Sequence, residues 1–281
     1  MTAARVLILG ASGRLGGMLR HHWIEGQGQP LWQFRSNPPR SVPYGSVHVF
    51  DPLSDLPECG PVDVVVCLAG IVPGKVAALS MNTALALAAV ECARGLGAKH
   101  VFLSSSAAVY GASESPLHED GAAIPASAYG QAKLDMEDAA LGLAARYGVG
   151  VTALRIGNVA GADALLGRQR SRYTLDQFAD GRGPVRSYIG PREFTRLLQA
   201  LSSLACCGAD IPTRLNLALR GAVEMADLCR EAALPFDWHP APAHALQSVV
   251  LDMARLADLL PLSPADPAAI VADWRADRRS A

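Results

Sequence analysis

The fold of this chain is indicated by one stretch of its sequence, Val6-Leu-Ile-Leu9-Gly10-Ala-Ser-Gly13-Arg-Leu-Gly16. The four apolar residues are typical of a buried β-strand, and the apolar side chains that follow at helical spacing predict a helix over 15–24. The first glycine lets the backbone turn, the second lets it approach a pyrophosphate, and the third lets helix pack on strand. We therefore expect a dinucleotide site formed by Gly10, Ser12, Gly13, Arg14, Leu15 and Gly16.

The same alternation of strand and helix recurs along the first half of the chain. Short apolar runs predict strands at 31–34, 47–50, 62–68, 100–104 and 150–156, and longer periodic segments predict helices at 81–96 and 127–147. Strands that are apolar on both faces and separated by helices form parallel sheets covered on both sides. We expect an α/β fold built on a Rossmann-type doubly wound parallel sheet.

In the second half of the chain the regular alternation of expected strands and helices is lost. Residues 161–192 show no clear period and read as a long loop, a feature that is usually functional. They are followed by an expected helix at 192–206, a strand at 213–217, a helix opening near Gly221, and helical stretches at 253–260 and 264–275. We expect 1–160 to form an NAD(P)-binding domain and 161–281 to form mainly a smaller substrate-binding region, partly interleaved with the first.

Composition excludes several classes of partner. The 281 residues are 50% hydrophobic and 18% charged, and the net charge of −1 offers no general attraction to nucleic acid or an anionic membrane. No apolar run reaches the length of a membrane helix. The six cysteines form no C-x-x-C pair, which favours reduced thiols and a cytoplasmic location. His239 and His244 have no third ligand nearby, so we expect no metal site.

The choice of cofactor depends on the residue that follows the second expected strand. An NAD site places a carboxylate there for the ribose 2′-hydroxyl, whereas an NADP site places an arginine for the 2′-phosphate. Here the residue is Arg35, which predicts NADP and makes NAD less favoured, although an exposed loop arginine is the alternative. Asp51, which closes the next strand, either bonds the adenine amine or forms a turn.

Tyr129 and Lys133 are four residues apart on an expected helix, so both project from one face. Such spacing is unusual in a chain whose three lysines are Lys75, Lys99 and Lys133, although an ordinary solvated pair is the alternative. An ammonium about 6 Å away would stabilise a phenolate by about 2.8 kcal/mol, or about two pKa units, at an effective dielectric constant of about 20. The tyrosine would then exchange a proton with a substrate oxygen.

Three serines, Ser104, Ser105 and Ser106, end the expected strand that begins at 100. They lie at the carboxyl edge of a parallel sheet, where open α/β folds bind ligands. One hydroxyl can bond the reacting oxygen, and we expect the other two to cap backbone groups.

These stretches together resemble the extended short-chain dehydrogenase/reductases of the nucleotide-sugar epimerase/dehydratase type. The resemblance covers nearly the whole chain. The motifs that carry it are the glycine turn, Leu68-Ala69-Gly70, Asn82, the serine run through Tyr110-Gly111, Tyr129-Gly-Gln-Ala-Lys133, Leu154-Arg-Ile-Gly-Asn158, Val185-Arg186-Ser-Tyr188, and Leu215-Asn-Leu-Ala followed by Gly221-Ala-Val-Glu.

The resemblance implies a role for each matching residue. Ser106 orients the substrate, Tyr129 is the catalytic acid/base, and Lys133 tunes Tyr129 and holds the nicotinamide ribose. Asn158 and Arg186 fall at substrate positions, Arg186 where the family grips a diphosphate. Leu68, Ala69, Gly70 and Asn82 fall at cofactor positions.

The chain also departs from the family pattern. Leu85-Ala86 stands where the family has Gly-Thr, and 239–244 lacks the segment that supplies the second phosphate-binding arginine of a nucleotide-sugar site. The arginine-rich segment 168–196 is compatible with an anionic substrate, and a solvated basic face is the equal alternative for all of its arginines except Arg186. Its arginines are Arg168, Arg170, Arg172, Arg182, Arg186, Arg192 and Arg196.

We expect an NAD(P)-dependent oxidoreductase or epimerase that transfers hydride at a carbinol or carbonyl carbon, for example of a sugar or sugar nucleotide. An NADPH-dependent reductase of a small carbonyl compound and a non-catalytic NADP-binding sensor are the alternatives. The helix at 81–96 carries only two charges, Glu91 and Arg94, and so needs a cover. A partner subunit in a homodimer is the expected cover, and packing within the chain is the alternative.

Overall fold

The computed structural model describes residues 4–72, 78–111, 116–168 and 170–280. Its strands are β1 (Arg5–Leu9), β2 (Gln29–Phe34), β3 (Ser46–Val49), β4 (Val64–Cys67), β5 (His100–Ser106), β6 (Gly150–Ile156), β7 (Asn158–Val159), β8 (Tyr173–Gln177), β9 (Val185–Arg186), β10 (Tyr188–Ile189), β11 (Arg214–Leu217), β12 (Val223–Glu224), β13 (Phe236–Pro240) and β14 (Ser248–Val249). Its helices are α1 (Arg14–His22), α2 (Met81–Leu96), η2 (Ala107–Val109), α3 (Ala128–Tyr147), α4 (Pro191–Cys206), α5 (Met225–Ala232), α6 (Ala254–Leu259) and α7 (Pro267–Ser280).

Seven parallel strands form the central sheet, in the order β11-β6-β5-β4-β1-β2-β3. This confirms the expected doubly wound α/β fold. One of the two edge strands, β11, comes from the second half of the chain and pairs with β6. The sheet is therefore completed by a segment that lies beyond the expected domain boundary at 160.

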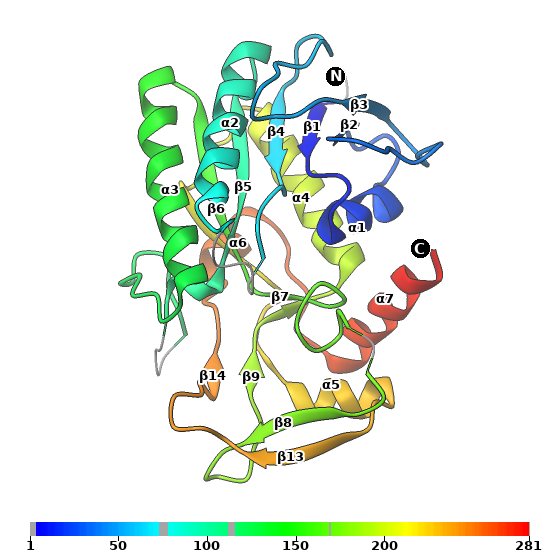
Figure 1. Ribbon diagram of the computed structural model, residues 1–281, viewed down its shortest axis with the longest axis vertical. Coiled ribbons are helices and arrows are strands. Elements are labelled where there is room, and N and C mark those ends of the chain that lie inside the picture. Colours follow the sequence, from blue (N-terminus) through cyan, green and yellow to red (C-terminus); the bar gives the residue numbers. More distant parts are fainter. Residues whose placement is uncertain (1–3, 73–77, 112–115, 169, 281) are drawn as a thin grey trace.

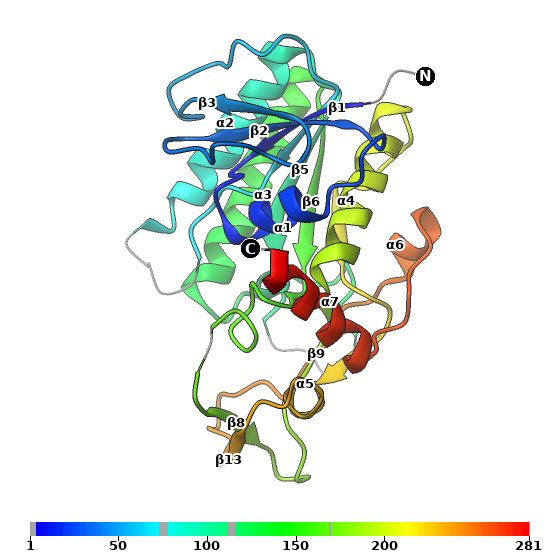
Figure 2. The same ribbon diagram turned by 90° about the vertical axis from the view of Figure 1, so that its right-hand side faces the viewer.

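Alternating side chains of each strand enter two separate cores. In β1, Val6 and Ile8 pack under α1 and α4, whereas Leu7 and Leu9 pack under α2 and α3. All four are at most 1% exposed, and full burial of such a side chain stabilises the fold by about 1.5–3 kcal/mol. Figure 2 shows α4 on one side of the sheet and α2 and α3 on the other.

Much of helix α2 is buried by contacts within its own chain. It packs against α3 and against β4 and β5, and it buries Ala86, Ala89, Val90 and Ala93. Packing within the chain thus covers one side of the helix, whereas Ala84 and Leu87 on another side are only half-buried. Met81, at the start of the helix, is 39% exposed.

A smaller lobe below the sheet contains β8, β13 and α5 (Figure 1). The expectation of a structureless 161–192 was wrong, because Tyr173–Gln177 forms β8, which pairs in parallel with β13. Tyr173 and Leu175 are buried and Thr174 is exposed, a period of two over too few residues to stand out. Helix α5 begins at Met225 rather than near Gly221, whose φ of +96° does not belong to a right-handed helix.

Helix α7 connects the two lobes, since it contacts α1, α4 and α5 (Figure 2). It buries Ile270, Val271 and Trp274. The Asp273 carboxylate accepts a hydrogen bond from the backbone N–H of Arg192 at 3.0 Å, at the start of α4. None of the helices in the described part of the chain is long and apolar enough to cross a membrane.

Candidate active site

The turn between β1 and α1 can be built only with glycine at two of its positions. Gly10 has φ of +85°, and a Cβ there would lie 2.6 Å from the backbone nitrogen of Ala69. A Cβ on Gly16 would lie 2.5 Å from the carbonyl oxygen of Gly10. Gly13 is the exposed N-cap of α1 and supplies no capping side chain, so the first amides of the helix are open to an anionic ligand. These features fit the pyrophosphate of a dinucleotide.

Gln33 supports this turn, and our sequence analysis missed it. Its Oε1 accepts a hydrogen bond from the backbone N–H of Gly10 at 2.8 Å, and its Nε2 donates to the carbonyl oxygen of Phe50 at 2.7 Å. The side chain is 2% exposed. A polar residue inside the apolar run Leu31-Trp-Gln-Phe34 was the available signal, since buried amides need partners.

The end of β4 lies beside the glycine turn. Leu68 and Ala69 both donate backbone hydrogen bonds to the carbonyl oxygen of Leu9. Asn82 is 1% exposed; its Oδ1 accepts from the N–H of Ile71 at 2.9 Å and its Nδ2 donates to the carbonyl of Leu79 at 3.0 Å. Its amide therefore holds the loop after β4. A Cβ on Gly70 would lie 3.4 Å from Nζ of Lys133, which links this loop to the next part of the site.

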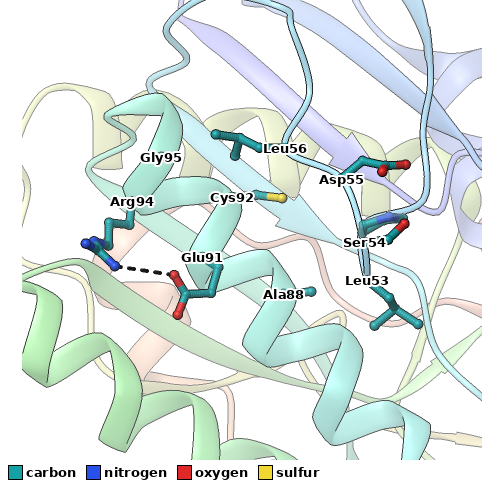
Figure 3. Close-up of a pocket in the computed structure, with 10 residues that line it drawn as sticks. Leu53, Ser54, Asp55, Leu56, Ala88, Glu91, Cys92, Arg94 and Gly95 are labelled. Carbon is teal, nitrogen blue, oxygen red and sulfur yellow. Dashed lines mark ion pairs between the residues drawn. The ribbon is translucent and has the colours of Figure 1, made fainter.

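Four other expected cofactor residues lie at the periphery of the turn. Ser12, Arg14 and Arg35 are exposed, Arg35 directly after β2, and Leu15 is half-buried. Asp51 adopts the turn-forming alternative, since its Oδ1 accepts from the N–H of Leu53 at 3.1 Å. The segment that follows borders a surface hollow of about 550 Å³ between Leu53, Leu56 and Cys92 of α2 (Figure 3).

The three expected catalytic residues come together at the end of β5. Ser127 caps α3 by accepting from the N–H of Gly130 at 3.1 Å, and Tyr129 lies in the first turn. The Tyr129 hydroxyl is hydrogen-bonded to Ser106, whose Oγ also accepts from the N–H of Ala108 at 3.2 Å. Lys133 is 3% exposed, and its Nζ donates to the carbonyl of Ser104 at 2.7 Å and lies 5.9 Å from the centre of the Tyr129 ring.

The electrostatics of this group differ from our expectation. Burial raises the pKa of Tyr129, and the hydrogen bond to Ser106 offsets this in part. The expected lowering by Lys133 was wrong, because Nζ is directed to the Ser104 carbonyl and burial lowers the pKa of Lys133 itself to about 8. At neutral pH the chain alone thus keeps Tyr129 protonated, ready to act as a proton donor.

The hydrogen bonds of Ser105 and Ser106 also differ from our expectation. Ser105 donates to the carboxylate of Glu137 instead of capping the backbone. Ser106 both caps the backbone N–H of Ala108 and bonds Tyr129.

On the expected substrate side, Asn158 lies in β7 and its side chain is hydrogen-bonded to Tyr188. The Tyr188 hydroxyl donates to Asp163 at 2.7 Å. The two Nη atoms of Arg186 donate to three backbone carbonyls, those of Val185, Leu246 and Gln247, at 2.8–2.9 Å. A diphosphate would have to compete with these carbonyls for the guanidinium.

Most of the arginine-rich segment is paired within the chain. The ion pairs are Arg172–Asp237, Arg182–Glu224, Arg192–Asp273 and Arg196–Glu193. Arg168 and Arg170 are exposed. Within the described ranges, no three His, Cys, Asp or Glu side chains gather as metal ligands.

Comparison with known proteins identifies the family that the sequence motifs resemble. The model of the NAD dependent epimerase/dehydratase family matches residues 6–188. UDP-glucose 4-epimerase of Azospirillum brasilense is 30% identical over 240 residues, which cover 80% of this chain and 66% of that protein. UDP-glucose 4-epimerase of Corynebacterium glutamicum is 27% identical over 209 residues, which cover 68% and 60%. The chain thus spans less than two thirds of the length of these relatives.

Solved structures show the same architecture. UDP-glucose 4-epimerase of Stenotrophomonas maltophila, with bound NAD and formylated UDP-arabinopyranose, superposes with a TM-score of 0.80 at 18% identity, covering 99% of this chain and 100% of that one. An NAD dependent NDP-hexosamine 5,6-dehydratase involved in tunicamycin biosynthesis superposes with a TM-score of 0.78 at 20% identity, covering 99% and 98%. At these identities the likeness shows a shared fold.

Proposed function

Because the chain belongs to the NAD dependent epimerase/dehydratase family, as its motifs predict, we propose that it is an extended short-chain dehydrogenase/reductase. It exchanges hydride with a carbinol or carbonyl carbon of a small molecule, of which a sugar or sugar nucleotide is the leading class. The observation that carries this proposal is the convergence of Ser106, Tyr129 and Lys133 beside Gly70 and the glycine turn.

The residues present fit a pyridine nucleotide. Gly10, Gly13 and Gly16 give the pyrophosphate access to the start of α1, with Ser12, Arg14 and Leu15 around it. Leu68, Ala69 and Gly70 would border its nicotinamide half, next to Lys133, whereas Asn82 acts through the loop it holds. The bound nucleotide supplies the hydride donor or acceptor.

The chain itself supplies the proton chemistry. Ser106 orients the substrate oxygen, and Tyr129 moves a proton between its phenolic oxygen and that substrate oxygen. Lys133, fixed by the Ser104 carbonyl, places a positive charge near the Tyr129 ring. Asn158 and the 161–281 region shape the substrate pocket.

A substrate panel tests this function. Sugar nucleotides and small carbonyl compounds are incubated with the protein and pyridine nucleotide, and nucleotide oxidation and isomerised products are measured. Turnover of one class is expected. Cofactor binding without turnover of any member would favour the sensor alternative.

A reductase of a small carbonyl compound is the second candidate, and the state of Arg186 favours it. The Nη atoms of that side chain are bonded to backbone carbonyls, so the site has less capacity to grip a diphosphate than the family pattern implies. The same panel separates the two candidates, since only the reductase accumulates oxidised nucleotide.

We propose NADP as the preferred cofactor, although the family and its solved relatives are described with NAD. Arg35 supports the proposal because it is exposed, follows β2 directly and forms no ion pair with another described residue. Titration of protein fluorescence should show NADPH binding about tenfold more tightly than NADH, the effect of about 1.4 kcal/mol from one charge-assisted contact.

Arg35→Asp should remove or reverse that preference. Arg146→Asp, which makes the same charge change at an exposed position of α3, should leave it intact. Tighter binding of NADH by the unmodified protein would contradict the use of Arg35.

We also propose a homodimer formed through α2 and α3. Between these helices lies a groove of about 650 Å³ lined mainly by small and apolar side chains, among them Ala84, Leu87 and Ala132, with Gln131 and Asp135 also in the lining. Ala84→Arg should halve the mass measured by light scattering, because it puts a charge at the contact. Ala179→Arg, at an exposed position of the smaller lobe, should not. A monomeric mass for the unmodified protein would rule the dimer out.

A cytoplasmic location is proposed as well. All six cysteines are free, and Cys67, Cys92 and Cys229 are buried, as expected for a chain kept reduced.

A further inference from the structure

Helix α3 meets the end of β5 through a stripe of three polar residues spaced four apart. Tyr129 bonds the Ser106 hydroxyl, Lys133 donates to the Ser104 carbonyl, and Glu137 accepts from the Ser105 hydroxyl. Residues four apart on a helix lie above one another on one face. Glu137 is thus the third member of the stripe that presents the proposed catalytic pair.

Glu137 is fully buried and has two charged partners among the described residues, Arg155 and Arg214. Arg155 donates to it through Nη2 at 2.8 Å and through Nε at 3.2 Å, and Arg214 donates through Nε at 3.3 Å. Arg155 is 2% exposed and stands opposite Ser105 in the pairing of β5 with β6. One carboxylate therefore ties α3 to β5, β6 and β11.

Few titratable groups face Lys133. Cys67 reaches it from β4, and Tyr129 and Glu137 flank it on α3. Burial raises the pKa of Cys67 to about 11, so the thiol is neutral at physiological pH. Glu137 is then the one negative charge among these neighbours.

We propose that Glu137 is a positioning residue for the Tyr129–Lys133 pair: it fixes the register of α3 on the serine run of β5 and keeps Lys133 protonated. The effect of Glu137 on catalysis rests on the proposed function. Its effect on the protonation of Lys133 does not depend on that function.

Burial lowers the pKa of Lys133 to about 8, and the Glu137 charge opposes that shift. Removing the charge should therefore move the pKa further down. A loss of about one unit is expected for charges separated by roughly one helical turn at a high effective dielectric constant. In the variant Lys133 would be largely neutral at pH 8.

The three lysines of the chain make this measurable without cofactor or substrate. Protein carrying ¹³C-labelled lysine should give three titrating signals, two of which are assigned with Lys75→Arg and Lys99→Arg. Lys75 lies outside the described residues, and Lys99 is exposed. In the unmodified protein the Lys133 signal should titrate near 8, and in Glu137→Gln about one unit lower.

Two matched variants isolate the charge. Glu137→Asp keeps the carboxylate and should leave the Lys133 midpoint near that of the unmodified protein. Asp138→Asn removes the neighbouring acid, which pairs with the same Arg214 but is 63% exposed, and should leave it unchanged. A Lys133 midpoint that stays in place in Glu137→Gln overturns the proposal.

Glu137→Gln leaves Arg155 buried without its full partner, which can prevent folding. Glu137→Met combined with Arg155→Met then replaces it, since an apolar pair of similar size leaves no unpaired buried charge. Glu137 acts on the pKa of Lys133 and its loss lowers the midpoint, but the positive charge of Arg155 is lost as well, so a smaller lowering than in Glu137→Gln is expected. An unchanged midpoint in that double variant overturns the proposal equally.

An activity arm separates this proposal from the proposed function. With a substrate in hand, the alkaline limb of the kcat profile should move to lower pH in Glu137→Gln while KM changes little. If Tyr129→Phe keeps full turnover, the proposed role of Tyr129 in proton transfer fails and the lysine titration still stands. If Tyr129→Phe is inactive and the alkaline limb of Glu137→Gln does not move, only the role of Glu137 fails.

Discussion

Replacement of Tyr129 by phenylalanine should lower turnover by a factor of about 10²–10⁴, the usual contribution of a positioned acid/base group. The substitution removes only the hydroxyl that is bonded to Ser106. The ring, half-buried near Lys133, stays in place. Affinity for the pyridine nucleotide should therefore be nearly unchanged, and steady-state turnover together with a fluorescence titration measures both quantities.

Tyr147→Phe is the matched control. It removes a tyrosine hydroxyl from the last residue of the same helix, where the hydroxyl bonds Glu91 at the surface, and should leave turnover intact. Retention of normal turnover by Tyr129→Phe would exclude Tyr129 as the proton-transfer group. Loss of nucleotide affinity in that variant would show that the hydroxyl serves binding rather than proton transfer.

The sequence was sufficient to predict features that depend on local spacing. The apolar run Val6–Leu9 predicted the strand, and the three glycines after it predicted the turn. Both features depend on neighbouring residues alone: the strand on the run of apolar side chains, and the turn on the conformational freedom of glycine. The four-residue spacing of Tyr129 and Lys133 likewise placed both on one helix face. The bounds of α2 were predicted to the residue, since its apolar run ends at a glycine with positive φ, Gly97.

Features that depend on distant pairing were not accessible. Glu137, Arg155 and Ser105 lie far apart in sequence, and each alone reads as an ordinary helix or strand residue. The same holds for β8 and β13, two five-residue strands that are separated in sequence by α4 and α5. A charged residue does not indicate which residue it will pair with, and a short alternating run does not indicate which strand it will pair with, until the fold is known.

The pKa of Tyr129 shows how the electrostatics of a residue in the fold can differ from an expectation based on sequence spacing. The expectation weighed only the attraction between phenolate and ammonium. In the structure, burial opposes the charged form of both groups, and the Lys133 ammonium is engaged by the Ser104 carbonyl. Burial of a side chain is a property of the folded molecule, so its effect could not be included at the level of sequence.

Gly10→Ala should abolish pyridine-nucleotide binding and cost roughly 2–5 kcal/mol of the free energy of unfolding. About 1–2 kcal/mol comes from placing a side chain at φ of +85°. About 1–3 kcal/mol more comes from the clash of its Cβ with the backbone of Ala69, which cannot move away without breaking the bond from its N–H to the Leu9 carbonyl. Denaturant unfolding and a nucleotide titration measure the two effects.

Gly26→Ala separates strain from clash. Gly26 has φ of +83°, nearly that of Gly10, but a Cβ there meets nothing within 4 Å. This variant should lose only the conformational part, about 1–2 kcal/mol, and bind the nucleotide normally. The difference between the two variants therefore measures how closely the end of β4 must approach the glycine turn. Equal losses of stability, or normal nucleotide binding by Gly10→Ala, would show that this close approach does not build the cofactor site.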